Sequence, residues 1–503
     1  MSEPNRPAAP ATPSDPARRP VLVGAATILQ REPDPGQAQE PLALMGDALE
    51  AAARDAGTRA LLEQADAIMA PRGFWEYGDP CRLLGQRLGC PQADTTIAEI
   101  GVLQTTLIGD AAARIASGEV DIVLVTGGEA RYRALRAQIA GDEAPMTADD
   151  GEADRVLRPH QEIMHPLEIE LDLMMAVKQY SVMENALRYR QGLDLDAHRR
   201  EVADMWAGFS EVAAGNPHAW RPDPVSSDAI REPAGKNTML AFPYTKFHNS
   251  QWNVDQAAGL ILCSEATAER LGVAREKWVY PLAVVESNHM VTLTERKDLE
   301  RCPGARLAGE RALEVAGLEA HQLDHIELYS CFPVAVRIQA RELGIPLDPT
   351  PSVTGGMAFG GGPLNNFVLQ AIARMVHVVR DDPGSRGLVT AVSGILTKQG
   401  FTLWSTEAGE APFAYEEVTE QVAEALETVE VAEQYTGDAV VAAYTVLYEG
   451  VEPTRAAAWC DTADGRRTIA VNTDPALLQY AMTQELCGRA VTIRDGAFER
   501  VEG

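Results

Sequence analysis

The same order of buried strands and amphipathic helices occurs twice in this chain of 503 residues. In the first half, PVLVGAATI (20–28) precedes a helical pattern at 44–57, LMGDALEAAARDAG. In the second half, VYPLAVVESN (279–288) precedes a helix at 306–317 that contains the similar LAGERALEVAG. Two unrelated α/β segments would also look alike, but the matched helix favours a duplication. Strands that alternate with helices predict a mainly parallel sheet, covered on both faces, in each half.

The charge of the chain excludes several classes of partner. It has 44 Lys and Arg against 73 Asp and Glu, a formal net charge of −29 at pH 7. Nucleic acid and anionic membrane surfaces select clustered Lys and Arg, so neither is expected as a partner. No run of 18 apolar residues predicts a membrane span. Seven cysteines without a C-x-x-C pair indicate neither a disulfide framework nor a zinc site, which is typical of a cytoplasmic protein.

Changes in composition and in the spacing of apolar residues divide the chain into seven segments. The insertion between the halves is too long for a connector and is expected to cover one end of the sheets. The tail has a three-stranded meander, a helix and a last strand, which predicts a discrete, partly open barrel similar to an OB-fold. The expected segments are a disordered leader (1–17), an N-terminal half (18–130), a helical loop subdomain inserted in it (131–241), its return strand (242–273), a C-terminal half (274–410), an acidic linker helix (411–432) and the barrel (433–503).

Several motifs resemble those of the thiolase superfamily. They are FPYTK (242–246), VDQAAGLILCS (254–264), ELYSCF (327–332), GGMAFGGGPLNN (355–366) and ILTK (395–398). With the added barrel, the set is similar to thiolase-like protein type 1, whose members are often labelled acetyl-CoA acetyltransferases. The resemblance implies a thiolase fold of two five-layered βαβαβαββ halves. It also implies an acyltransferase-like protein of lipid metabolism, monomeric or homodimeric, that takes CoA or an acyl-CoA as ligand and holds no permanent cofactor.

The positions that carry thiolase catalysis hold other residues in this chain. By the resemblance, Gly101 lies where a thiolase has its nucleophilic cysteine, at the start of a buried helix that favours thiolate. Gly362 replaces the histidine that activates this cysteine, and Val392 or Ser393 replaces a second active-site cysteine. Tyr329 replaces the Asn or His that helps to hold a catalytic water. Ordinary thiolase activity is therefore not expected.

The remaining polar groups can still bind or convert a thioester. Tyr329, predicted at the end of a central strand, can donate or remove a proton, or it can be a packing residue. Thiolase-like steroid aldolases are similar in placing tyrosine in this motif. His289 and His248 are the candidate general bases, each with a structural alternative. Cys331 is interpreted as a buried core thiol rather than a nucleophile.

A glycine loop and two lysines complete the candidate binding site. The bare backbone of the loop can approach a carbonyl oxygen or a pantetheine chain, or it can simply form a turn; its glycines are Gly355, Gly356, Gly360, Gly361 and Gly362. Asn365 can contact a ligand, or with Asn366 it can cap the helix expected at 367–379. Lys246 and Lys398 can contact a phosphate or carbonyl group, or remain solvated. No motif predicts a metal site or a second nucleotide.

Three functions remain open at this point. One is an acyltransferase or C–C bond enzyme with a rearranged site. The second is a retro-aldolase that acts on a hydroxyacyl-CoA through Tyr329, which needs acid and base groups but no nucleophile. The third is a non-catalytic protein that binds a CoA thioester or serves as a scaffold.

Overall fold

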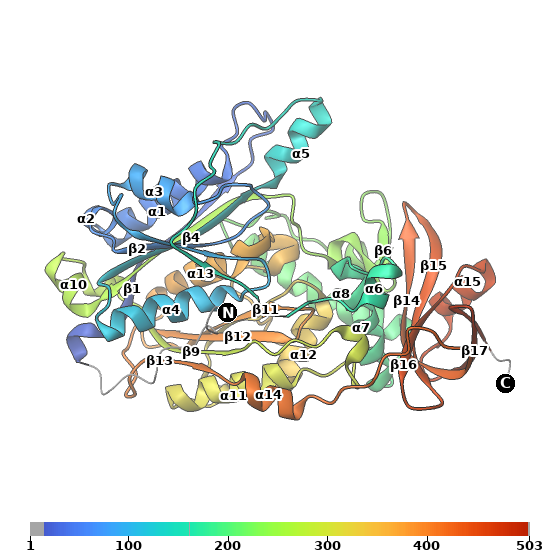
Figure 1. Ribbon diagram of the computed structural model, residues 1–503. Helices are drawn as coiled ribbons and strands as arrows, with labels where there is room; N and C mark the ends of the chain where they lie inside the picture. Colours follow the sequence, from blue (N-terminus) through green and yellow to red (C-terminus); the bar gives the residue numbers. More distant parts are fainter. Residues whose placement is uncertain (1–14, 160, 501–503) are drawn as a thin grey trace.

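The computed structural model describes residues 15–159 and 161–500 (Figure 1). Most of the expected leader, residues 1–14, lies outside the described residues, and its end forms a 3-10 turn at Pro16–Arg18. Within the described ranges, no helix is both long and apolar enough to cross a bilayer.

Two mixed sheets form the body of the molecule, one from each half of the chain. In the first sheet, the return strand β8 runs antiparallel to its neighbours β1 and β4, and the other pairings are parallel. The spatial order is β1 (Pro20–Gln30), β8 (Asp255–Ser264), β4 (Ile122–Ala130), β2 (Ala67–Pro71), β3 (Asp94–Ala98) and β5 (Arg155–Leu157). The second sheet has the order β10 (His325–Glu327), β11 (Gly387–Ser393), β12 (Lys398–Ser405), β9 (Tyr280–Ser287) and β13 (Ala414–Glu417).

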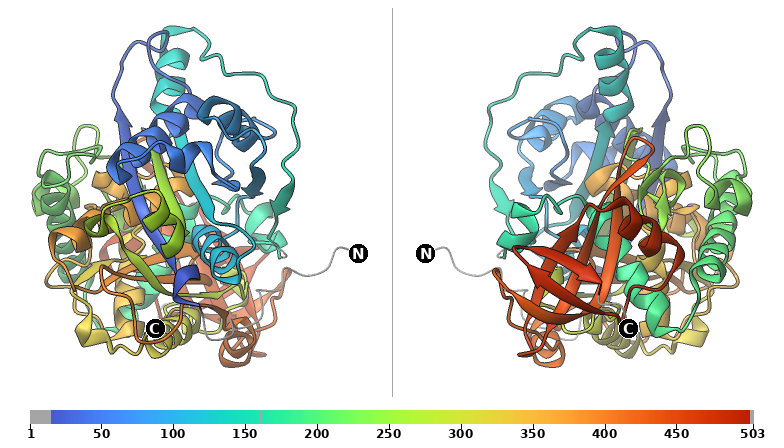
Figure 2. Two further views of the ribbon diagram at one scale, coloured as in Figure 1. Left: turned by 90° about the vertical axis from the view of Figure 1, so that its left-hand side faces the viewer. Right: turned by 90° about the vertical axis from the view of Figure 1, so that its right-hand side faces the viewer.

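Helices lie outside each sheet and between the two sheets, which gives five layers (Figures 1 and 2). The middle layer consists of α4 (Gln104–Ser117) and α13 (Phe367–Asp381), each of which packs against strands of both sheets. The outer layers contain α1 (Pro41–Ala56), α2 (Ala60–Glu63), α3 (Pro80–Leu88) and α10 (Glu265–Arg270) in the first half, and α11 (Pro303–Ala316) and α12 (Pro333–Leu343) in the second. The predicted fold class of two similar layered α/β halves is confirmed, but the sheets are mixed rather than mainly parallel, because β8 and β12 run antiparallel to both of their neighbours.

Two glycines allow α1 to lie directly on the first sheet. Gly24 of β1 and Gly259 of β8 face the helix, and a Cβ atom at either position would overlap the backbone of Ala52 or Ala48. The helix ends before Gly57, whose φ of +86° is readily adopted only by glycine. The small residues of this segment therefore set a short distance between helix and sheet.

The insertion forms a helical cap at one end of the sheets. Its first helix, α5, protrudes from the body, whereas α6 to α8 lie beside the C-terminal barrel (Figure 1). The insertion contains α5 (Arg131–Ala140), the edge strand β5 of the first sheet, α6 (Pro166–Glu170), α7 (Ala176–Arg190), α8 (Leu195–Ala214), α9 (Ser227–Arg231) and β6 (Met239–Ala241), followed by β7 (Tyr244–Thr245).

A buried ion cluster fixes the insertion to the second half. Glu184 of α7 pairs with Arg337 of α12, accepts a hydrogen bond from Tyr244 Oη at 2.6 Å, and lies 2.9 Å from His198 Nε2. Burial by itself would raise the pKa of Glu184, but Arg337 and the bonds from His198 and Tyr244 lower it to about 2. The cluster therefore holds α7, α8 and α12 together through a carboxylate.

The C-terminal segment forms a closed barrel of five strands, because β14 pairs with both β15 and β17. The sheet also continues past β14 into β6 and β7 of the insertion through the single pair Leu447–Ala241, so one edge of the barrel contacts the insertion. The unpredicted strand, β18, follows a turn in which Asp495 and Gly496 both have positive φ. The elements are β14 (Gly437–Glu449), β15 (Glu452–Thr462), β16 (Arg467–Asn472), α15 (Pro475–Thr483), β17 (Ala490–Arg494) and β18 (Ala497–Arg500).

The segment expected to be an acidic linker helix has two parts. Ala414–Glu417 forms β13, which extends the second sheet by pairing parallel with β9. Only then does the helix α14 (Thr419–Ala425) follow. The acidic composition hides the strand, because its side chains are only half-buried or exposed.

Candidate functional site

The N-termini of α4 and α13 meet where the two halves join. Gln104 Nε2, in the first turn of α4, donates to Asn365 Oδ1 at 3.0 Å, and Asn365 Nδ2 donates to the carbonyl of Arg72 at 2.9 Å. Asn366 is buried, and neither polar atom of its side chain has a hydrogen-bond partner among the described residues; the same holds for Gln104 Oε1. Asn366 therefore does not cap α13 through its side chain, contrary to the sequence interpretation. Helix N-termini favour a partial negative charge, so this junction suits a carbonyl oxygen.

Gly101 lies three residues before α4 with a φ of +101°. Its carbonyl accepts a hydrogen bond from Lys398 Nζ at 2.6 Å and one from Ser393 Oγ at 3.4 Å. A Cβ atom at Gly101 would lie 3.1 Å from Pro159 Cγ. Burial lowers the pKa of Lys398, while the Glu286 carboxyl acts in the opposite direction. Lys398 thus contacts a carbonyl of the protein's own backbone, and its predicted contact with a ligand stays a prediction.

Tyr329 lies in the loop between β10 and α12, so its predicted position at the end of a central strand is wrong. The strand ends at Glu327, and β10 is at the edge of its sheet. At Tyr329, hydrogen bonds to side chains take the place of backbone hydrogen bonds between strands. Thr390 Oγ1 accepts from the Tyr329 N–H at 2.8 Å, and Gln339 Nε2 donates to the Tyr329 carbonyl at 2.9 Å. The ring meets Phe367 edge-on at 5.7 Å. Burial raises the pKa of Tyr329, and its hydroxyl makes no hydrogen bond to a described residue.

Cys331 is a buried thiol near the same loop. Burial raises its pKa to about 12, against a smaller opposing effect of a hydrogen bond with Tyr180. Ser250 Oγ donates to the Cys331 carbonyl at 2.9 Å, and Ser250 Cβ lies 3.2 Å from the place of a Cβ on Gly362. The loop between β10 and α12, which carries Tyr329 and Cys331, therefore lies beside Gly362. The Cys331 thiol is protonated at neutral pH. Val392, on β11, is buried.

The glycine loop is a π-helical turn at Gly356–Gly360. Its carbonyls accept backbone hydrogen bonds from the insertion: Trp220 N–H to Gly360 at 2.9 Å and Arg221 N–H to Phe359 at 2.8 Å. A Cβ on Gly355, Gly356 or Gly361 would collide with Ala213, Phe209 or Gln256, respectively. These three glycines are thus explained by close packing of the protein on itself.

A carboxylate that the sequence interpretation overlooked holds the start of this loop. Glu327 accepts from the N–H groups of Val353 (2.7 Å) and Thr354 (2.8 Å), and from the hydroxyls of Ser352 and Thr354 at 3.0 Å each. Burial raises the pKa of Glu327 to about 7, against the effect of these donors. Its signal in the sequence is an acidic residue within an apolar strand.

The two candidate histidines lie in different environments. His248 is buried, and its Nδ1 accepts from the Thr245 N–H at 3.1 Å, so it caps its own turn; burial lowers its pKa to about 3. Lys246, on the same turn, is exposed. His289 follows β9, is half-buried, and has no ring hydrogen bond to a described residue; burial lowers its pKa. Of the two imidazoles, only that of His289 has no hydrogen-bond partner among the described residues, so His289 is the better candidate for a general base.

A surface of alternating arginines and aromatic rings adjoins the glycine loop. The Arg131 guanidinium carbon lies 4.7 Å from the Phe74 ring and 5.4 Å from the Trp252 ring, and both rings are exposed. Arg221 lies 4.7 Å from the Phe247 ring. We call this surface the arginine–aromatic face; it consists of Arg31, Phe74, Arg131, Trp220, Arg221, Phe247 and Trp252. None of its arginines forms a salt bridge with a described carboxylate, in a chain of strongly negative net charge.

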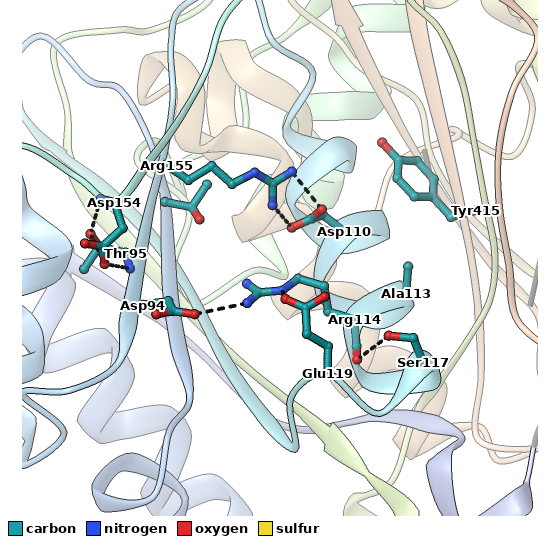
Figure 3. Close-up of a pocket in the computed structure, with 11 residues that line it drawn as sticks. Asp94, Thr95, Asp110, Ala113, Arg114, Ser117, Glu119, Asp154, Arg155 and Tyr415 are labelled. Atoms are coloured by element: carbon teal, nitrogen blue, oxygen red, sulfur yellow. Dashed lines mark hydrogen bonds and ion pairs between the residues drawn. The ribbon is translucent and has the colours of Figure 1, made fainter. Parts of the chain in front are cut away.

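A separate cavity of about 530 Å³ lies between α4, β3 and β5 (Figure 3). Its arginines are already paired: Arg155 contacts the Asp110 carboxylate at 2.7 and 3.0 Å, and Arg114 Nε contacts Glu119 at 2.7 Å. Four carboxylates line it against these two arginines. None of the sequence-predicted site residues lines this cavity, and its charge does not suit an anionic thioester.

Comparisons with known proteins agree with this architecture. A family model for the thiolase-like protein type 1 additional C-terminal domain matches residues 417–497. An acetyl-CoA acetyltransferase of Methanocaldococcus jannaschii is 28% identical over 166 residues, which cover 33% of this chain and only 40% of that protein.

Two solved structures bear on the fold and on the tail. The crystal structure of a monomeric SCP2-thiolase like protein type 1 from Mycobacterium smegmatis has a TM-score of 0.81 at 28% identity, over 97% of this chain and 99% of that one. An Ltp2–ChsH2(DUF35) aldolase has a TM-score of 0.59 at 17% identity over 78% and 98% of the two chains, which shows the shared fold alone. The fold, the added barrel and the relatives together confirm the predicted resemblance: the chain has a thiolase-like fold and is similar over 97% of its length to a thiolase-like protein type 1.

Proposed function

We propose that this protein binds CoA or an acyl-CoA thioester at the junction of its halves and has no ordinary thiolase activity. The observation that carries the proposal is the set of unpaired polar atoms on Gln104 and Asn366, buried at the N-termini of two helices. A buried polar atom without a partner in the protein is normally satisfied by water or a ligand. A thioester carbonyl can accept from the Asn366 amide and from the positive ends of α4 and α13.

The arginine–aromatic face supports the anionic part of such a ligand. CoA carries phosphates and an adenine ring, and unpaired guanidinium groups over exposed rings offer both ion pairing and stacking. Because Arg221 is bonded through its backbone to the glycine loop, this face continues toward the junction. Fixed cations in an otherwise acidic protein would also attract an anion to this surface.

The absence of thiolysis rests on the residues around Gly101. An acyl-enzyme needs a thiolate or alkoxide there, and glycine offers neither. The Lys398 ammonium is occupied by the Gly101 carbonyl at 2.6 Å. The Cys331 thiol, with its pKa raised to about 12, carries almost no thiolate at pH 7.

Isothermal titration with CoA and acetyl-CoA tests binding. We expect a saturable heat for the wild type and about tenfold weaker binding for Arg131→Gln, a loss of about 1.4 kcal/mol. The matched control is Arg306→Gln, which removes an exposed cation on α11, outside this face. No heat and no thermal shift with either ligand at millimolar concentration would refute the proposal, as would equal losses in the two variants.

Retro-aldol cleavage of a hydroxyacyl-CoA is the second candidate, and the free hydroxyl of Tyr329 favours it. Because burial raises its pKa, Tyr329 is a proton donor at neutral pH. His289, held neutral by its lowered pKa, can take the proton of the substrate hydroxyl. The carbon–carbon bond then breaks, a carbonyl product leaves, and the thioester enolate takes a proton from Tyr329.

Single-turnover cleavage by Tyr329→Phe tests this second function. A positioned acid contributes about 10²- to 10⁴-fold, so we expect turnover to fall at least 100-fold while thioester affinity stays the same. Equal turnover would make Tyr329 a packing residue. No cleavage by the wild type would leave the non-catalytic binding role as the better account.

We also propose a cytoplasmic monomer. The short strand β5 covers the edge of β3, so the first sheet offers no long open edge for a second copy at that side. All seven cysteines lie in the described ranges as buried free thiols, which suits a reducing compartment.

A further inference from the structure

A second polar cavity, of about 340 Å³, lies on the other border of the glycine loop. Three cationic or potentially cationic side chains line it: Arg374 and His377 from α13, and His218 from the loop after α8. We call it the His218–His377 cavity. Its volume suits a small metabolite rather than a whole CoA molecule.

The charges of the cavity are not balanced within the protein. Arg374 forms no salt bridge with a described carboxylate, and its Nε contacts only the Val353 carbonyl, at 3.4 Å. His377 Nε2 lies 3.1 Å from the Ala25 carbonyl, so its Nδ1 is the open ring nitrogen. His218 has no ring hydrogen bond to any described residue. The cavity therefore contains one unpaired cation and two imidazoles beside it.

Neighbouring groups explain why both imidazoles are neutral without a ligand. Burial lowers the pKa of His218, and His377 and Arg374 lower it further. Burial also lowers the pKa of His377, and the charges of Arg380 and Arg374 lower it further. The Asp55 carboxylate acts in the opposite direction.

The other acidic groups near α13 do not neutralise the cavity. Asp55 is paired with Arg380 at 2.7 Å, so its charge is already shared. Asp381 lines the cavity but is exposed to solvent.

Of the two amide side chains beside the cavity, Gln370 strengthens the case for a ligand. Gln370 lines the cavity, is 8% exposed, and forms no hydrogen bond through its side chain with a described residue. Gln256 is 1% exposed, and its Oε1 also lacks a partner. Gln256 Oε1 is an acceptor that an oxyanion cannot satisfy, whereas the Gln370 amide can donate to a polar guest in the cavity.

We infer that the His218–His377 cavity binds a small oxyanion, a carboxylate or phosphate group, on Arg374, Gln370 and the two histidines. The anion pairs with the guanidinium and accepts from the Gln370 amide. It also favours protonation of the imidazoles beside it, so binding takes up protons and strengthens as the pH falls. This site is independent of the thioester site proposed above, because it needs no residue of the junction.

Titration of the full-length protein with succinate and with inorganic phosphate tests the inference, at constant ionic strength. We expect saturable binding of at least one of them, about tenfold tighter at pH 6 than at pH 8. The stronger ligand shows whether the site prefers the planar or the tetrahedral oxyanion. Failure of both to saturate at pH 6 would overturn the inference.

Two variants separate the ligand site from the fold. Arg374→Gln is expected to weaken binding at least tenfold, whereas Arg306→Gln, an exposed cation on α11, leaves it unchanged. Gln370→Leu keeps the shape and removes only an amide without a partner, so we expect weaker binding with an unchanged or higher Tm. Binding equal to wild type in both Arg374→Gln and Gln370→Leu would refute the assignment even if the oxyanion binds elsewhere.

Discussion

Replacing Glu327 with Gln tests whether a buried carboxyl controls the stability of the glycine loop. Burial raises the pKa of this group from its ordinary 4.5 to about 7. Between these values the folded protein keeps the proton that the unfolded chain has lost. Below pH 4.5 the raised pKa of this carboxyl therefore does not lower the free energy of unfolding. As the pH rises, the free energy of unfolding falls by up to 1.36 kcal/mol per pH unit, and the loss reaches about 3 kcal/mol above pH 7.

A glutamine at this position cannot ionise and so lacks this dependence. Its oxygen can accept from the N–H groups of Val353 and Thr354, and its NH₂ can donate to the hydroxyls of Ser352 and Thr354, which now serve as acceptors. At pH 5 we therefore expect Glu327→Gln to unfold within about 1 kcal/mol of wild type. At pH 8 the variant is expected to be more stable than wild type by about 2 to 3 kcal/mol.

Urea unfolding at pH 5 and pH 8 measures this difference. Comparison with wild type cancels the effects of Glu129 and Glu286, whose pKa values burial also raises to about 7. An exposed control, Glu310→Gln, is expected to show no such change with pH. A difference between Glu327→Gln and wild type that is the same at both pH values would refute the reasoning, because the four donors would then hold the carboxyl ionised.

Three further outcomes are expected. Thiolysis of acetoacetyl-CoA should stay near background and should not change in Cys331→Ser; a rate lost in that variant would show that the thiol is the nucleophile. Gly361→Ala should lower the free energy of unfolding by about 3 kcal/mol, because the side chain would be strained at a φ of +111° and would also collide with Gln256. The control Gly317→Ala, where φ is +66° and the space is open, should lower it by about 1 kcal/mol. Equal losses of Tm in the two variants would contradict this prediction. The pKa of Glu184 is lowered to about 2, so the stability that its carboxylate contributes is fully present above pH 4.5 and is lost as the pH falls toward 2. In Glu184→Gln, the free energy of unfolding should therefore depend less on pH over that range. An unchanged acid transition would contradict this prediction.

The layered fold could be predicted because its signals are local. Apolar strands and helices with one small-residue face appear directly in the sequence, and glycines within the strands, such as Gly24 and Gly259, mark where a helix packs closely. The strands that were missed lack this signal. β13 is acidic and mostly accessible, and β18 is a four-residue strand that depends on the turn at Asp495 and Gly496.

The candidate site was predictable in its loops but not in its contacts. Motif order located Gly101, Tyr329 and Gly362 near one another, and the structure brings them to the junction of the halves. The partners of Lys398 and Glu327 are backbone groups, and no residue pattern encodes which backbone group a side chain will reach. The arginine–aromatic face was also missed, since its members are spread from Arg31 to Trp252 and become neighbours only through the fold.

The strand shared between the insertion and the barrel has a consequence for synthesis on the ribosome. Ala241 of β6 pairs with Leu447 of β14, and Asn185 of α7 donates to the Tyr444 carbonyl at 3.0 Å. Asn185 and Tyr444 are 259 residues apart, so at 5–20 residues per second α7 waits about 13–52 s for the strand that covers it. During that interval an apolar face is open to other nascent chains. We therefore expect production of this protein to depend on chaperone capacity and translation speed more than its final stability suggests.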